Sequence, residues 1–189
     1  MPLSNVLIDR GLNGLAALGR VHPLSRRLMV ESEVVKDVPY GDGPSQLLDI
    51  YRPKGVQGPL PTLLYVHGGG FRILSKETHW MFGHGFAAMG FCVFSIDYRL
   101  APANPFPAAL EDTVQALCWI AEHAGDYGAD LERLVYGGES AGANLVSSLM
   151  VAGCWERPEP LAQRVWALGL TPSVVLPACG ILQVSDGAR

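Results

Sequence analysis

The 189-residue sequence has few charged residues and no excess of basic ones. Only 17% of the residues are charged, and the net charge is −4. Proteins that bind nucleic acid through its phosphates need a basic face, so we expect no nucleic-acid partner. The four cysteines lie far apart and form no C-x-x-C pair. We therefore expect buried free thiols, as in a reducing compartment, and no metal site.

Long apolar runs are also missing. No stretch approaches the roughly 20 apolar residues that a membrane span requires, and Asp9 and Arg10 interrupt the N-terminal stretch MPLSNVLIDRGLNGLAALG before a signal-peptide core can form. We therefore expect no membrane span and a location in the cytoplasm. Because 49% of the residues are apolar, the chain can bury one substantial core, which favours a single domain.

The N-terminal residues carry apolar side chains at intervals of three and four. This spacing predicts an amphipathic helix, broken or bent at its glycines; the apolar positions are Leu3, Val6, Leu7, Leu15 and Leu18, and the glycines are Gly11 and Gly14. The apolar face needs a partner. It could pack against the core in the ordinary way, or it could form part of a cap over a site.

The rest of the chain predicts an α/β fold. Two strands near 33–39 and 46–52 flank a Gly-Asp-Gly-Pro turn, which indicates a hairpin. Apolar runs at 62–67, 91–98, 133–138 and 173–180 then alternate with helical segments at 79–89, 108–123, 141–155 and 160–168. This alternation predicts a mostly parallel sheet with helices on both faces. In such a sheet, chemistry belongs at the carboxyl ends of the strands.

A Gly138-x-Ser140-x-Gly142 pattern stands at one such end, between an apolar strand and an apolar helix. The pattern alone is a weak signal, but its setting is that of a serine nucleophile held on a sharp turn. The alternative is a glycine-rich turn in which the serine only caps the helix.

A second glycine run, His67-Gly68-Gly69-Gly70, follows another apolar strand. Glycines allow unusual backbone dihedrals, so that N–H groups can be aimed at the oxyanion formed in acyl transfer. Neither phosphate-binding pattern, G-x-x-x-x-G-K-[ST] or G-x-G-x-x-G, can be read here. His67 could serve as a general base, but its position before the glycines favours a role in bracing the loop.

Four motifs together resemble the hormone-sensitive-lipase-like branch of the α/β-hydrolase fold, which contains bacterial carboxylesterases. They are HGGGF at 67–71, DYRLAP at 97–102, FPAALED at 106–112 and GESAGAN at 138–144. The resemblance covers about residues 34–149. It implies hydrolysis of esters with short or medium acyl chains by a Ser-His-Asp triad, without a cofactor.

The resemblance also implies roles for individual residues. Ser140 would be the nucleophile, and the backbone amides of Gly69, Gly70 and Ala141 would form the oxyanion hole. Residues 1–30 would be a cap-type helical segment, and residues 31–189 the N-terminal portion of a single α/β-hydrolase domain. Arg99 would pair with Asp112. Glu139 replaces the more usual aspartate and would either support the site or be exposed to solvent; the other supporting residues would be His67, Gly68, Gly138 and Gly142.

The triad cannot be completed in the order of this fold, in which the acid and then the histidine follow the nucleophile. All five histidines precede Ser140, and Asp186 is the only later aspartate. Asp186 falls too early to be the acid of the family, so we interpret it as a loop residue. Without a base, turnover falls by a factor on the order of 10⁴ to 10⁶, so we expect the isolated chain to be inactive.

Three explanations remain open for the absent histidine. A C-terminal segment of the same protein, present as a second polypeptide, could supply it. The chain could instead be an inactive fragment or a non-catalytic small-molecule-binding protein, as the related plant gibberellin receptors are. A partner chain, for example the second copy in a homodimer, could also donate a histidine. The first is favoured, because a sheet truncated after about its sixth strand would expose an apolar edge.

Overall fold

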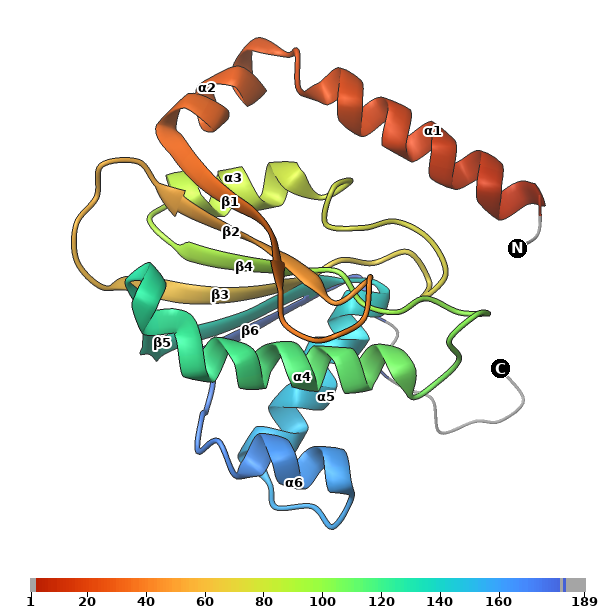
Figure 1. Ribbon diagram of the computed structural model, residues 1–189, viewed down its shortest axis with the longest axis vertical. Coiled ribbons are helices and arrows are strands. Elements are labelled where there is room, and N and C mark those ends of the chain that lie inside the picture. The colour runs from red at the N-terminus through yellow and green to blue at the C-terminus, as the bar shows by residue number, and fades with distance from the viewer. Residues whose placement is uncertain (1–2, 181, 183–189) are drawn as a thin grey trace.

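The computed structural model describes residues 3–180 and 182. It shows a six-stranded sheet with helices on both faces (Figure 1). The strands are β1 Ser32–Pro39, β2 Leu47–Pro53, β3 Leu60–Val66, β4 Cys92–Ile96, β5 Ala129–Glu139 and β6 Val174–Ala178. The helices are α1 Leu3–Gly19, α2 Pro23–Glu31, α3 Trp80–Ala88, α4 Ala108–His123, α5 Ala141–Cys154 and α6 Pro160–Trp166, with a short 3₁₀ turn at Ala124–Tyr127.

The sheet has the order β1-β2-β4-β3-β5-β6. β1 and β2 form the expected antiparallel hairpin, β2 runs antiparallel to β4, and the remaining pairs are parallel. In the parallel part, Val66 at the end of β3 lies in register with Ile96 of β4 and Gly138 of β5. The loops that follow β3 and β5 therefore start side by side, which brings the two glycine motifs to the same edge of the sheet.

Each face of the sheet has its own apolar core. α3 packs on β2 and β4, and Gly83 permits the contact because a Cβ there would lie 2.5 Å from the Tyr51 ring. α4 and α5 cover the opposite face over a larger cluster that includes Phe94, Leu117 and Val146. The predicted helices and the predicted α/β class are thus confirmed.

The N-terminal segment differs from the expectation in two respects. α1 is one unbroken helix, so the predicted break near Gly11 and Gly14 is wrong; a glycine inside a helix costs only about 1 kcal/mol. α2 was not expected, although Pro23 at its first position is an ordinary helix-start signal. Its N-cap is His22, whose side chain accepts the Leu24 N–H. Figure 1 shows both helices on the α3 side of the sheet.

β6 forms one edge of the sheet. Within the described part of the chain it pairs with β5 alone, and Val174 and Leu176 are 47% and 44% exposed. The four cysteines are free, as expected, but only Cys92 is buried; Cys179 is exposed because it follows this uncovered strand. No helix of the described chain is long and apolar enough to cross a membrane.

Candidate active site

Ser140 sits on a strained turn between β5 and α5. Its backbone has φ 52° and ψ −112°, a conformation that costs a non-glycine residue about 1–3 kcal/mol and occurs mainly at functional sites. The Ser140 N–H donates to the Ala178 carbonyl over 2.8 Å, which fixes the turn against the end of β6. The side chain makes no capping bond to α5 and is exposed. Helix capping, the alternative role for this serine, is therefore wrong.

The two motif glycines are required by close backbone contacts around this turn. A Cβ on Gly142 would lie 2.0 Å from the Val66 carbonyl oxygen, and one on Gly138 would lie 2.6 Å from the Gly142 carbonyl carbon. Real Cβ atoms do not approach backbone so closely. Glycine at both positions thus lets the start of α5 pack directly on the end of β3.

The glycine run after β3 adopts the unusual dihedrals that its composition predicts. Gly69 has φ 112° and Gly70 φ 59°, and the Gly69 carbonyl accepts the N–H groups of Arg72 and Ile73. Among the described residues, no hydrogen bond uses the Gly69 or Gly70 N–H. Ala141 is the first residue of α5, so its N–H has no acceptor within the helix. Three amide donors are thus available near Ser140, as the oxyanion-hole prediction requires, and their role stays a prediction.

His67 braces this loop. Its ring is buried, and Nδ1 lies 2.7 Å from the Gly68 carbonyl oxygen and Nε2 3.6 Å from Oδ1 of Asp97. Tyr98 stacks on the ring at 4.4 Å and donates its hydroxyl to the His67 carbonyl. Burial lowers the pKa of His67 to about 3, so the ring is neutral at physiological pH. These contacts agree with bracing, and none of them involves Ser140.

Glu139 is not simply exposed to solvent, because its carboxylate contacts the glycine loop. Its Oε1 accepts the Gly68 N–H at 2.6 Å and a hydrogen bond from His79 Nε2 at 2.9 Å. The hydrogen bond from His79 lowers the pKa of Glu139, and the Gly68 amide adds to the effect. The carboxylate therefore ties the serine turn to the glycine loop.

No histidine of the chain serves Ser140. Each of the five makes another hydrogen bond: His22 with Leu24, His67 with Gly68, His79 with Glu139, His84 with Ser32 and His123 with Trp119. None of the hydrogen bonds between described residues involves the Ser140 hydroxyl. Asp186, the alternative acid, lies outside the described residues.

A cavity of about 410 Å³ opens beside the turn. Its walls come from the glycine loop (Gly70, Phe71 and Arg72), from the Arg99–Phe106 segment and from one side of α4 and α5, including Asn144. Asn144 lies one helical turn beyond Ser140 in α5, so the cavity opens close to the serine turn. Arg99 in its wall pairs with buried Asp112 at 2.9 Å, as the resemblance implied.

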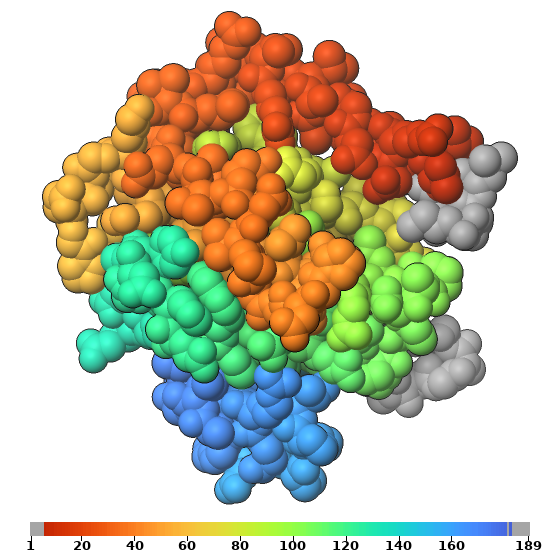
Figure 2. Space-filling model, in the orientation of Figure 1, coloured from red at the N-terminus to blue at the C-terminus, as the bar shows by residue number. Residues whose placement is uncertain are grey.

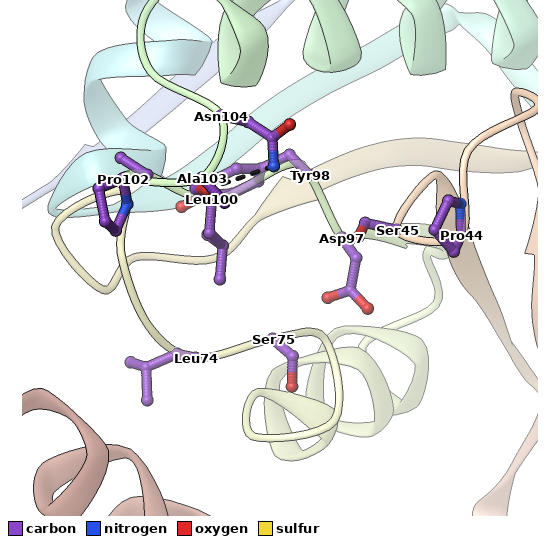
Figure 3. A pocket seen from close by; sticks show the side chains of 11 residues that line it. Pro44, Ser45, Leu74, Ser75, Asp97, Tyr98, Leu100, Pro102, Ala103 and Asn104 are labelled. Carbon is purple, nitrogen blue, oxygen red and sulfur yellow. Dashed lines mark hydrogen bonds between the residues drawn. The ribbon is translucent and has the colours of Figure 1, made fainter. Parts of the chain in front are cut away.

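A larger cleft, of about 690 Å³, lies between the loop at Leu74 and Ser75 and the segment from Asp97 to Asn104. Figure 3 shows Leu74 and Ser75 facing Asp97 and Leu100 across it. Its wall includes neither a residue of the glycine run nor one of the serine turn. We therefore place the candidate site at the smaller cavity.

An acidic cluster near this cleft was not foreseen from the sequence. Carboxylate oxygens of Asp37, Asp49 and Glu77 lie within 4.8 Å of one another, a spacing that could hold a metal. Lys76 occupies the space between them instead: its Nζ lies 2.6 Å from Asp37 and 2.8 Å from Asp49. Burial disfavours the Lys76 charge, but these hydrogen bonds outweigh it and raise the pKa. Arg20 and Lys36 pair with Glu77, so the three carboxylates face three cationic side chains of the same chain.

The fold and the site define an α/β protein with a serine turn of the hydrolase type beside a glycine loop. A family model of the alpha/beta hydrolase fold matches residues 63–173, more than half of the sequence. The chain belongs to this family. This membership confirms the fold expected from the four motifs.

Named relatives agree with the resemblance. Carboxylesterase NlhH of Mycobacterium tuberculosis is 40% identical over 98 residues, which are 51% of this chain and 30% of the relative. Mouse hormone-sensitive lipase is 38% identical over 118 residues, 61% of this chain and 15% of the relative. Both names lie within the group that the motifs indicated.

Solved structures show the same likeness. Esterase LipW from Mycobacterium marinum has a TM-score of 0.68 and 29% identity, over 84% of this chain and 50% of that one. The ester-hydrolase EH1AB1 from the metagenome of Lake Arreo has a TM-score of 0.68 and 30% identity, over 100% of this chain and 54% of that one. The chain spans about half the length of the structures it matches.

Proposed function

We propose that this chain carries the nucleophile of a carboxylic ester hydrolase that acts on short to medium acyl chains. The observation that carries the proposal is the strained Ser140 turn, packed against a glycine loop whose Gly69 and Gly70 amides make no hydrogen bond among the described residues. The carboxylesterase and lipase relatives support it.

In the proposed reaction Ser140 Oγ attacks the ester carbonyl while a histidine takes its proton. The amides of Gly69, Gly70 and Ala141 hold the oxyanion, and the alcohol leaves with the proton that the histidine returns. Water, activated by the same histidine, then releases the acid from Ser140. No step requires a cofactor. α1 and α2 would form part of the cap, since Asp9 of α1 accepts the Leu74 N–H of the loop beyond the glycines.

The triad acid and histidine would come from a C-terminal segment of the same protein, present as a second polypeptide. Two observations support this origin. The five histidines precede Ser140 and have other partners, and the chain covers about half of the solved esterases. Val174 and Leu176 of β6, which are 47% and 44% exposed, offer a surface for such a segment. Donation of a histidine by a second copy is the competing arrangement.

The test begins with protein purified from its natural source without denaturation. Intact mass under denaturing conditions should show a second polypeptide of roughly 100 or more residues, and the assembly should release p-nitrophenol from p-nitrophenyl butyrate. The Ser140→Ala variant should lose this activity by a factor on the order of 10⁴ or more. Ser147→Ala is the matched control, because the Ser147 hydroxyl donates to the Ala143 carbonyl of its own helix and makes no other hydrogen bond among the described residues.

The outcomes separate the candidate functions. A single polypeptide that binds a small apolar ligand without hydrolysing the ester would favour a non-catalytic binding protein and refute the enzyme. A single polypeptide that is active only as a dimer would assign the histidine to a second copy.

A further inference from the structure

His79 is buried behind the glycine loop and contacts neither Ser140 nor the candidate cavity. It is the N-cap residue of α3, and its side chain faces Glu139. A carboxylate can only accept, so the His79 Nε2 carries a proton and donates it over 2.9 Å. On the other side of the ring, Nδ1 lies 3.0 Å from the Ser75 carbonyl and 2.9 Å from the Thr78 hydroxyl. Both nitrogens are thus held by neighbours.

The ring is also held by stacking. His67 stacks on one side of His79 with ring centroids 5.5 Å apart, and Phe82 stacks on it at 5.9 Å. His67 in turn stacks on Tyr98. A ring fixed in this way can orient its hydrogen-bond partner without moving itself.

That partner reaches the glycine loop directly. The same Oε1 of Glu139 that accepts from His79 also accepts the Gly68 N–H. Only glycine allows this approach, since a Cβ at position 68 would lie 2.3 Å from Oε1. Gly68 immediately precedes Gly69 and Gly70. The hydrogen bond from the Gly68 N–H to Glu139 therefore fixes the backbone at the start of the segment that orients the Gly69 and Gly70 amides.

We propose that His79 is a positioning residue, which orients the Glu139 carboxylate and through it the Gly68 peptide and the oxyanion donors at Gly69 and Gly70. The proposal rests on the proposed function, because the donors matter only if Ser140 forms an oxyanion. Loss of one oxyanion donor typically lowers kcat 10² to 10³-fold. His79 acts on such donors indirectly, so its loss should lower kcat by roughly 10 to 100-fold and leave KM within a few fold.

The experiment compares three variants of the complete assembly. His79→Ala removes the donor, and His79→Gln keeps an N–H that can reach Glu139. His123→Ala is the control, because His123 bonds to the Trp119 carbonyl at the end of α4. We expect the alanine variant at position 79 to lose kcat as stated, the glutamine variant to recover most of it, and the control to match wild type. Far-UV circular dichroism establishes that each variant is folded.

A second readout does not depend on activity. In ¹H–¹⁵N spectra of the chain, the Gly68 amide should shift in His79→Ala and in Glu139→Ala, and keep its position in His123→Ala. If wild type is inactive, the proposed function fails, and the Gly68 amide alone decides whether His79 positions the loop. Unchanged kcat and an unmoved Gly68 amide in His79→Ala would overturn the proposal. Equal loss of kcat in His79→Ala and His79→Gln would overturn it too, since a purely structural role predicts no rescue.

Discussion

Adding one methyl group at Gly142 should separate the serine turn from the end of β3, against which it packs. In Gly142→Ala the new Cβ would lie 2.0 Å from the Val66 carbonyl oxygen, 2.7 Å from its carbon and 2.8 Å from the His67 carbonyl oxygen. All three are backbone atoms, so no side-chain rotation relieves the contact. Either α5 or the end of β3 has to move.

The expected cost can be worked from these contacts. Overpacking a core typically costs 1–3 kcal/mol, and a backbone clash of this depth belongs at the upper end, about 3 kcal/mol. The higher helix propensity of alanine than of glycine offsets up to about 1 kcal/mol of this loss of unfolding free energy. The net loss is therefore about 2 kcal/mol or more. With a urea m value of about 2.5 kcal/mol/M, this loss lowers the unfolding midpoint by roughly 0.8 M.

The assay is urea unfolding followed by far-UV circular dichroism, with Gly85→Ala as the matched control. Gly85 lies inside α3, and a Cβ there would meet nothing within 4 Å, so the control should gain about 0.5–1 kcal/mol. An unfolding midpoint for Gly142→Ala equal to that of Gly85→Ala would refute the close packing of the turn on β3.

Three further changes follow from the same contacts. Ser140→Gly should raise the free energy of unfolding by up to about 1 kcal/mol in urea titrations, because glycine accepts φ 52° without strain; a loss of stability would contradict the strained turn. Burial opposes ionisation of Glu77, but hydrogen bonds from Lys36 and Arg20 outweigh it and lower its pKa to about 2. The stabilisation that ionised Glu77 provides is therefore complete above about pH 5 and is lost as the pH falls toward 2. Glu77→Gln should lower the free energy of unfolding by about 1 kcal/mol at pH 7, after allowance for solvent screening, and by less at pH 3. An equal loss at both pH values would refute the lowered pKa of Glu77. Leu176→Lys on β6 should lower the affinity for the second polypeptide more than tenfold, since burying a leucine side chain contributes about 1.5–3 kcal/mol; gel filtration would measure the bound fraction. An undiminished bound fraction would place that segment elsewhere.

Local patterns were sufficient to predict most of the fold. The hairpin, the parallel strands and the helices that cover them follow from the spacing of apolar residues and glycines, because each signal is contained within a few neighbouring positions. α2 was missed because its polar Arg26 and Arg27 weaken the helical pattern. The break predicted in α1 was wrong because isolated glycines only lower helix stability; they do not end a helix unless a competing turn is formed.

The site was only partly predictable for a different reason. Motifs identified Ser140 and the glycine loop, since their spacing reflects local backbone geometry. The roles of His79 and Lys76 depend on partners 60 and 39 positions away in the chain, Glu139 and Asp37. No signal in the sequence distinguished the buried His79 from an ordinary helix-start residue, and only the fold brings it to the carboxylate behind the glycines.

The central claim is that Ser140 is the nucleophile of an ester hydrolase. A p-nitrophenyl alkylphosphonate, which bonds irreversibly to an activated serine, tests it most directly. The natural assembly is treated with the probe, digested and analysed by peptide mass spectrometry. The account predicts that activity is lost in step with one phosphonyl group on the peptide that contains Ser140, and that Ser140→Ala takes up none. An active assembly that carries the label on any other residue, or that remains active with Ser140 fully labelled, would contradict it.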